Sequence, residues 1–280
     1  MGRIGTARSC LSTLNSFRRF RAGKDLSFRA MNEDLVERYE AFLLESGLRR
    51  NTSSFYLRNL RTVYRAAAEQ GLVERKDIFC HVYTGFDKTV KRAIDMDYVK
   101  RMCDLQLSAD TSMGFARDVF LFSIFTRGMP FVDMAYLRKS DLRDGYLCYR
   151  RKKTHRSLMI LWEPQMQEIV DRYAEATRNL PYMLPIITRL DGTERRQYEA
   201  AIRKVNCNLK RIAERIGLGT SLTTYVARHT WASMAHTLHT PLSVISEALG
   251  HDSEKTTQTY IAQLNSSAVD DANKRILMSL

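Results

Sequence analysis

Hydrophobic positions in the first 83 residues recur every three or four residues, the spacing of amphipathic α-helices. Gly47 follows one such face where a helix would end, and Asn51–Ser53 supplies capping residues for the next helix. The hydrophobic positions of these two helices are Leu35, Tyr39, Phe42, Leu43, Phe55, Leu60, Val63 and Tyr64. The pattern predicts an all-helical N-terminal domain over residues 1–83.

A polar segment, residues 84–92, interrupts this pattern. It contains Gly85 together with Lys88, Lys91 and Arg92, a composition typical of a linker. A second domain is therefore predicted over residues 93–280, with a C-terminal tail from about residue 261.

The second domain changes between helical and strand patterns. Residues 115–125 are apolar on nearly every side, which predicts a central, buried helix. Residues 145–161 place strand-forming side chains on both sides of a basic centre, which predicts a β-hairpin with a charged tip. Later helices are expected to end at Gly217 and Gly250, the second one beginning at Thr240-Pro241. The predicted fold class is mainly α with a small β-sheet or hairpin.

Composition adds a candidate partner. The chain has 280 residues and 44% hydrophobic content, enough for one large or two modest cores. Its formal net charge of +13 favours a polyanion, above all nucleic acid, although a merely basic surface is the alternative. Apolar residues interrupt the basic clusters outside the hairpin, so those clusters lie on folded elements. The expected DNA contacts are Arg49, Arg50, Arg58, Arg61, Arg150, Arg151 and Lys152.

Several protein classes lack their signatures in this sequence. No apolar run approaches the roughly 18 residues of a membrane helix, and the N-terminus has no apolar core of a signal peptide. The five cysteines are widely spaced, without metal or redox spacing, which favours reduced thiols and a cytoplasmic location. No Gly-rich loop ending in Gly-Lys-Ser/Thr occurs. We therefore expect neither a membrane segment nor a cofactor.

Tyr260 lies nine residues after His251, and both follow Arg127 and Arg228 in the chain. In-line attack on a phosphodiester builds negative charge on the nonbridging oxygens, which planar guanidinium groups are suited to stabilise. Arg127 follows an apolar run, where an unpaired charge is costly, and this favours function, although Asp133, the first acid downstream, could still pair with it. A phenol, with its pKa of about 10, needs such positive potential to react near neutrality. The set suggests Tyr260 as a nucleophile.

These residues belong to motifs in a characteristic order: Thr126-Arg127-Gly128, Lys153-Thr154, Ala227-Arg228-His229-Thr230, Leu249-Gly250-His251 and Thr257-Gln258-Thr259-Tyr260. From about Arg92 to Tyr260, the chain resembles the catalytic domain of the tyrosine recombinase (phage integrase) family. Residues 1–83 resemble the family's core-binding, SAM-like domain more loosely, through position and helix content.

The resemblance implies a site-specific DNA recombinase that forms a 3′-phosphotyrosyl link and a free 5′-hydroxyl, without ATP or metal. It implies double-stranded DNA with specific recombination sites as a partner, and a tetrameric synapse on that DNA. The implied catalytic residues are Arg127, Lys153, Tyr225, Arg228, His251 and the nucleophile Tyr260. Integration, excision and inversion stay open, as does the need for an accessory DNA-bending protein.

Lys153 is the implied general acid because it precedes Thr154, as in the family pattern, whereas Lys152 is expected to be a simple phosphate contact. His251 is expected to hydrogen bond the scissile phosphate or to help in proton handling. His229, beside the second arginine, is expected to be structural.

The chain departs from the family pattern in two places. Tyr225 stands where the family usually has His or Lys, so a hydroxyl could contact phosphate there but could not act as a base at neutral pH. The segment from Arg127 to Leu137, with Pro130 and Asp133, is a few residues longer than usual. Which residue orients Arg127 is therefore open.

Two other functions remain as alternatives. Helices near residues 224–238 and 241–249 are joined by a short turn, as in a helix-turn-helix regulator, where Arg228 and His229 would contact DNA. A type IB topoisomerase would use similar chemistry without strand exchange. The apolar tail after Tyr260 would fold back on its own domain or pack on a neighbouring subunit.

Overall fold

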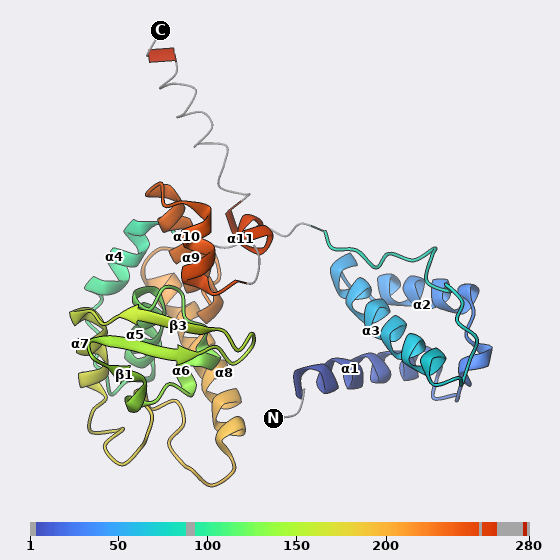
Figure 1. Cartoon of the computed structure of the whole chain (residues 1–280), viewed down its shortest axis with the longest axis horizontal. Helices are drawn as coiled ribbons and strands as arrows, with labels where there is room; N and C mark the ends of the chain where they lie inside the picture. The colour runs from blue at the N-terminus through green and yellow to red at the C-terminus, as the bar shows by residue number, and fades with distance from the viewer. Residues whose placement is uncertain (1–3, 88–92, 252–253, 262–276, 279–280) are drawn as a thin grey trace. The chain divides into compact units, whose positions relative to one another are not determined.

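The computed structural model describes residues 4–87, 93–251, 254–261 and 277–278. The chain divides into two compact units, residues 1–89 and residues 90–280 (Figure 1). Each unit encloses a hydrophobic core of its own. Among the described residues, none of the helices has both the length and the apolar character needed to cross a bilayer.

Unit 1 is helical, as the sequence predicts. It contains α1 (Ile4–Phe20), the 3-10 turn η1 (Phe28–Ala30), α2 (Glu33–Glu45) and α3 (Arg50–Glu69). Tyr39 of α2 is fully buried at the centre, where its hydroxyl donates to Ser16 Oγ at 2.9 Å and its ring meets Phe17 edge-on. Asn32 caps α2 by accepting from the backbone N–H of Leu35 at 2.9 Å. The helical pattern ends at residue 69, and residues 70–87 form turns and loop.

The helix α3 begins one residue earlier than the predicted cap. Arg49 occupies the N-cap position, and Asn51 lies in the first turn. The Asn51 side chain does not cap the helix; its amide donates to the carbonyl of Asp87 at 2.9 Å and accepts from the Asp87 N–H at 2.7 Å. The Asn51 side chain therefore bonds to the distant Asp87 backbone in place of the nearby backbone N–H groups that a helix cap would bind.

Residues 84–87, part of the predicted linker, are hydrogen-bonded along α3. Ser54 Oγ donates to the carbonyl of Gly85 at 2.6 Å, and Arg61 donates to Thr84 Oγ1 at 3.0 Å. Residues 84–87 are therefore held by unit 1, and the division between the two units falls after residue 89, within the predicted linker. Residues 88–92, the rest of the predicted linker, lie outside the described residues.

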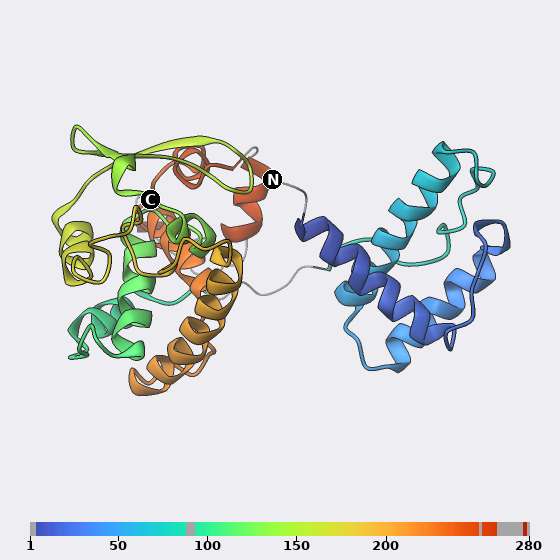
Figure 2. The same ribbon diagram turned by 90° about the horizontal axis from the view of Figure 1, so that it is seen from below.

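Unit 2 combines helices with one small antiparallel sheet, which confirms the predicted fold class. Before the sheet come α4 (Met96–Asp104), α5 (Ser112–Phe125), α6 (Phe131–Ala135) and the 3-10 turn η2 (Lys139–Asp141). The strands β1 (Leu142–Arg143), β2 (Tyr146–Arg150) and β3 (Ser157–Leu161) pair in the order β1-β2-β3. After the sheet come α7 (Pro164–Arg172), α8 (Glu194–Arg215), α9 (Thr224–Thr237), α10 (Leu242–Leu249) and α11 (Glu254–Ile261). The sheet covers one side of the helices (Figures 1 and 2).

The central helix of unit 2 is α5, which packs against α7, α8 and α9. Its residues from Ala116 to Ile124 are all buried, as the mostly apolar pattern predicts, and they include the ion-paired Arg117 and Asp118. The β2–β3 hairpin is also confirmed, with Tyr146 opposite Leu161 and Arg150 opposite Ser157. It leaves residues 151–156 as its basic tip.

Two helix ends follow the glycine prediction. Gly217 follows α8 and Gly250 follows α10, both with left-handed φ of 72° and 61°. The start of α10 differs in detail, because Pro241 is the N-cap and not the first helical residue. The left-handed turn at Gly250 ends α10 and places His251 directly after the helix.

Candidate active site

The arginine of α9, Arg228, is the centre of the candidate site. Only 3% of Arg228 is exposed. Its Nη1 donates to the carbonyl of Gly128 at 2.9 Å, and its Nη2 donates to the carbonyl of Leu249 and lies 3.1 Å from His251 Nε2. One guanidinium therefore connects the turn after α5, the end of α10 and the histidine that follows it. A fixed, buried cation of this kind is what stabilises an oxyanion.

Arg127 and Gly128 form a left-handed turn at the end of α5, with φ of 57° and 72°. Arg127 is half-buried, and its Nη1 donates to the carbonyl of Met159 on β3 at 3.4 Å. The sequence left Asp133 as a candidate partner for Arg127, but the structure places Asp133 against Arg151 and Lys152. The turn thus brings the two predicted catalytic arginines to adjoining segments.

Gly128 can only be glycine in this arrangement. A Cβ added there would lie 2.8 Å from the Arg228 Cα, and the positive φ would strain any L-residue. We expect Gly128→Ala to lower the free energy of unfolding by about 3 kcal/mol, from strain and overpacking together. Urea denaturation with the matched variant Gly145→Ala checks this, because Gly145 has φ of 77° and open space around its Cβ. Equal losses in both variants would show that the contact with Arg228 is unimportant.

His251 is buried and has a defined tautomer. Because arginine can only donate, His251 Nε2 accepts from Arg228, and Nδ1 therefore carries the proton and donates to Thr257 Oγ1 at 2.8 Å. Burial, with Arg228, Arg151 and Lys153 nearby, lowers the pKa of His251 to about 4. His251 is thus neutral at physiological pH, and both of its ring nitrogens are hydrogen-bonded. Thr257 belongs to one of the sequence motifs, but the motif did not predict that this threonine orients the His251 ring.

The lowered pKa of His251 predicts a pH-dependent stability. As pH falls, unfolded His251 gains its proton near 6.5, whereas folded His251 stays neutral to about 4, so acid favours unfolding between these values. Between pH 7 and pH 5 the wild type should lose about 2 kcal/mol more than His251→Asn. Urea denaturation of both proteins at the two pH values checks this. His239→Asn, at an exposed histidine, should behave as the wild type, and an unchanged pH dependence in His251→Asn would contradict the prediction.

Lys153 lies at the exposed tip of the β2–β3 hairpin, and its charge contributes to the lowered pKa of His251. Its neighbour Lys152 is held differently, with its Nζ 4.6 Å from the centre of the Tyr136 ring. The surroundings of Lys152 and Lys153 therefore differ in the structure, whereas in the sequence only the family resemblance set the two lysines apart.

Tyr225 does not join the buried group around Arg228. It is 53% exposed, and its ring meets the ring of His229 edge-on, with centroids 4.8 Å apart. Residues 225 and 228 are three apart on α9, but their side chains lie in different surroundings, one exposed and the other buried. His229 is buried, as expected for a structural residue.

Tyr260 belongs to α11, one turn after Thr257. The predicted nucleophile itself, the side chain of Tyr260, lies outside the described residues, as do residues 262–276 of the predicted tail. The described part of α11 nevertheless places the backbone of residue 260 one turn from the threonine that orients His251.

The predicted DNA contacts on α3 engage residues of their own unit. Arg50 lies over the Tyr83 ring at 3.7 Å, Arg58 lies over the Phe86 ring at 3.6 Å, and Arg61 contacts Thr84. Arg49, Arg50, Arg150 and Lys152 are exposed. Arg58 and Arg61 are half-buried. Arg150 Nε donates to the carbonyl of His155 at 2.6 Å.

Arg151 differs from the expectation of a DNA contact. It is 6% exposed, and its guanidinium donates to the carbonyls of Leu249 and Gly250. An arginine whose donors are turned inward in this way has almost no surface to offer DNA. Arg156, which the sequence reasoning passed over, donates to the carbonyl of His251 at 2.6 Å.

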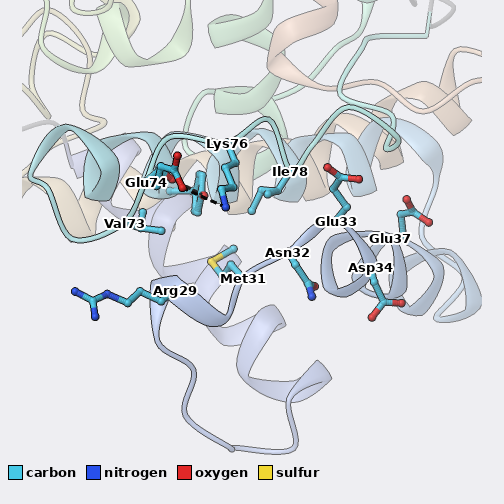
Figure 3. A pocket seen from close by; sticks show the side chains of 11 residues that line it. Arg29, Met31, Asn32, Glu33, Asp34, Glu37, Val73, Glu74, Lys76 and Ile78 are labelled. Carbon is cyan, nitrogen blue, oxygen red and sulfur yellow. Dashed lines mark hydrogen bonds and ion pairs between the residues drawn. The ribbon is translucent and has the colours of Figure 1, made fainter.

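A cavity of about 770 Å³ lies elsewhere, in unit 1, between α2 and the loop after α3 (Figure 3). Its lining carries four carboxylates: Glu33, Asp34, Glu37 and Glu74. Negative side chains repel phosphate, so this cavity does not suit a DNA backbone. Within the described parts of the chain, one trio has metal-ligand spacing, the exposed Glu33, Cys80 and His81, whose donor atoms lie within 4.8 Å of one another.

Comparisons with known proteins agree with this geometry. Residues 1–83 match the phage integrase SAM-like domain, and residues 121–266 match the phage integrase family. No curated protein is matched by the sequence. A lambda integrase (75–356) dimer bound to a COC′ core site is similar in structure, with 16% identity, a TM-score of 0.69, and coverage of 93% of this chain and 89% of that chain.

Two further solved structures share the fold. XerH recombinase bound to palindromic difH has 16% identity and a TM-score of 0.69, covering 95% of this chain and 78% of that chain. The Tn1549 transposon integrase with a circular intermediate DNA has 13% identity and a TM-score of 0.65, covering 95% of this chain and 92% of that chain. With the family model spanning more than half of its residues, the chain belongs to the phage integrase family, the tyrosine-type site-specific recombinases.

Proposed function

We propose that the chain cleaves and rejoins DNA at specific sites through a 3′-phosphotyrosyl intermediate, with Tyr260 as the nucleophile. The observation that carries the proposal is the buried Arg228, fixed to the carbonyls of Gly128 and Leu249 beside a neutral His251. These contacts hold the guanidinium in place before any substrate arrives. Such preorganised positive charge is most effective where water is excluded.

The chemistry divides among the remaining residues. The Tyr260 oxygen attacks phosphorus and its proton is released, while the bond from phosphorus to the 5′-oxygen breaks. Lys153, exposed at the tip of the hairpin, supplies the proton that the 5′-oxygen takes up. Arg127 joins Arg228 in stabilising the nonbridging oxygens. The phosphotyrosyl bond conserves the energy of the broken bond, so rejoining needs no nucleotide hydrolysis.

The helix-turn-helix alternative fits the site less well. A regulator that reads DNA with α9 would need Arg228 and His229 on its surface, but these residues are 3% and 5% exposed. Their burial argues against a role of these two residues in base recognition. We propose double-stranded DNA carrying recombination sites as the partner, with a tetramer as the assembly that exchanges strands.

Covalent trapping tests the proposal. Duplexes built from repeats near the encoding gene, nicked beside the cleavage site, should give an adduct that survives denaturing electrophoresis. The nick releases a short strand and blocks rejoining, so the intermediate accumulates. Mass spectrometry should place the DNA on the peptide that contains Tyr260. Failure of every such duplex to form an adduct would count against a covalent mechanism, and relaxation of plasmid without any site would instead favour a topoisomerase.

A further inference from the structure

Arg151 is a buried cation of unit 2 that takes no part in the proposed cleavage reaction. It follows the last residue of β2, and its Nη1 donates to the carbonyls of Leu249 at 3.0 Å and Gly250 at 2.7 Å. Its Nε lies 3.7 Å from Asp133 Oδ2. One side chain thus connects the hairpin to the segment that leads into His251, 98 and 99 residues further along the chain.

The fit at Gly250 is close. A Cβ added to Gly250 would lie 3.0 Å from the Arg151 Cδ and 3.2 Å from the Leu158 Cδ1, and φ there is 61°. The stem of Arg151 therefore packs directly on the backbone of this turn. The absence of a side chain at residue 250 lets the hairpin approach the end of α10 closely enough for both hydrogen bonds.

The hairpin tip is held from both ends. At its far end Arg156 donates to the carbonyl of His251 at 2.6 Å, and the N–H of Arg151 donates to the carbonyl of Arg156 at 2.9 Å. Asp133 accepts from the N–H of Lys152 at 2.8 Å while it faces Arg151. Lys153 stands between these anchors, on a tip whose two ends are fixed to the residues around His251.

Burying a guanidinium is costly unless its donors are used, and a hydrophobic side chain of similar volume would serve packing as well. Arg151 Nη1 donates to two carbonyls of the segment that also accepts from Arg228. Within the described residues its Nε has no hydrogen bond and only faces the Asp133 carboxylate at 3.7 Å. The charge therefore does what an apolar side chain could not, because it sets the distance between the hairpin and the His251 turn by directional bonds.

We propose that Arg151 is a positioning residue that holds Lys153 in reach of the departing 5′-oxygen, by tying the hairpin to the carbonyls of Leu249 and Gly250. This role rests on the proposed function, in which a bond forms between Tyr260 and phosphorus, the bond to the 5′-oxygen breaks, and Lys153 gives that oxygen a proton. Loss of Arg151 leaves the phosphate-binding arginines in place and disturbs the proton donor.

The test compares two leaving groups. Nicked duplexes are prepared with the ordinary 5′-oxygen or with sulfur at that bridging position, because a departing thiolate is stable without a proton. In single-turnover cleavage by the full chain, Arg151→Met should be about 100-fold slower than the wild type on the oxygen duplex. On the sulfur duplex it should come within a few-fold of the wild type, and Lys153→Ala should show the same rescue.

Two variants complete the design. Arg143→Met removes an exposed arginine of the same sheet and should leave both rates unchanged. Arg151→Lys keeps the charge but is one atom shorter than arginine, so its ammonium reaches the two carbonyls less well, and it should show the same rescue with a smaller defect. It also serves as the test variant if Arg151→Met does not fold.

The outcomes separate the two proposals. Equal slowing of Arg151→Met and Arg151→Lys on both duplexes, with unchanged thermal unfolding, would overturn the positioning role, because the defect would then lie in phosphate binding or attack. If the wild type forms an adduct but no Arg151 variant is rescued by sulfur, the positioning role alone fails. If the wild type forms no adduct on either duplex, the proposed function fails with it.

Discussion

Replacing Tyr260 by phenylalanine is expected to abolish the covalent adduct while leaving DNA binding intact. The substitution removes one oxygen from the last full turn of α11 and changes neither charge nor shape appreciably. With no phenol to attack, the rate of adduct formation should fall by at least about 10⁴-fold, the scale of losing a nucleophile outright. Denaturing electrophoresis with a nicked duplex measures the adduct, and a gel shift under native conditions measures binding.

A second tyrosine provides the control for this result. Tyr146 lies on β2, is 40% exposed, and its replacement by phenylalanine should leave both the adduct and binding unchanged. An adduct that persists in Tyr260→Phe would show that another side chain attacks. Loss of native DNA binding together with the adduct would instead indicate that the substitution acts on folding of α11.

Replacing Arg228 by alanine should affect both chemistry and stability. The guanidinium satisfies the carbonyls of Gly128 and Leu249 and donates to His251, so its removal leaves buried acceptors without a donor. We expect a loss of about 3–5 kcal/mol in the free energy of unfolding. Cleavage should fall about 10³-fold or more, since the principal buried cation of the site is gone.

Arg228→Lys separates the two effects. Lysine keeps the charge but, having no planar fork, cannot reach three acceptors in fixed directions. Its loss of stability should therefore be smaller than that of alanine, while cleavage should still fall about 100-fold. Urea denaturation and single-turnover cleavage measure the two quantities, with Arg215→Ala, at an exposed position of α8, as the control. Wild-type cleavage by Arg228→Lys would contradict a geometric role for the guanidinium.

The helices, the hairpin and the family could be predicted from the sequence, because they follow from local residue patterns and from the order of the motifs. The mostly apolar run of α5 predicted a buried central helix, and the strand formers on both sides of residues 151–156 predicted the hairpin. The motifs around Arg127, Arg228 and His251 fixed the family, because their order and spacing are rarely met by chance. Each element and each motif is recognisable within a short window, whereas the family signal lies in the order of the motifs along the chain.

Features that depend on distant partners could not be predicted. Arg151 is the second of two adjacent arginines and looks identical to Arg150 in the sequence, yet one is buried and the other exposed. The difference arises because β2 alternates its faces and because the carbonyls that receive Arg151 lie at the end of α10. The predicted capping role of Asn51 is wrong for the same reason, because the side-chain amide of Asn51 binds the backbone of the distant Asp87.

The hydrogen bonds within the predicted linker could not be predicted from its composition. Residues 84–87 contain a glycine and two polar residues, like many linkers, but the glycine carbonyl accepts from Ser54 and also from Arg58, at 3.3 Å. Polarity reports that a segment avoids the hydrophobic core. It does not report whether the segment's backbone is bonded to a helix.

The stacking of Arg50 on Tyr83 and of Arg58 on Phe86 affects the conformational entropy that these side chains would lose on binding a polyanion. A mobile arginine that captures a phosphate gives up roughly 2 kcal/mol of rotamer entropy at that moment. These two guanidinium groups are already confined against aromatic rings, so much of that entropy is lost when unit 1 folds. Association at this face would therefore be opposed less by conformational ordering than its long, charged side chains suggest.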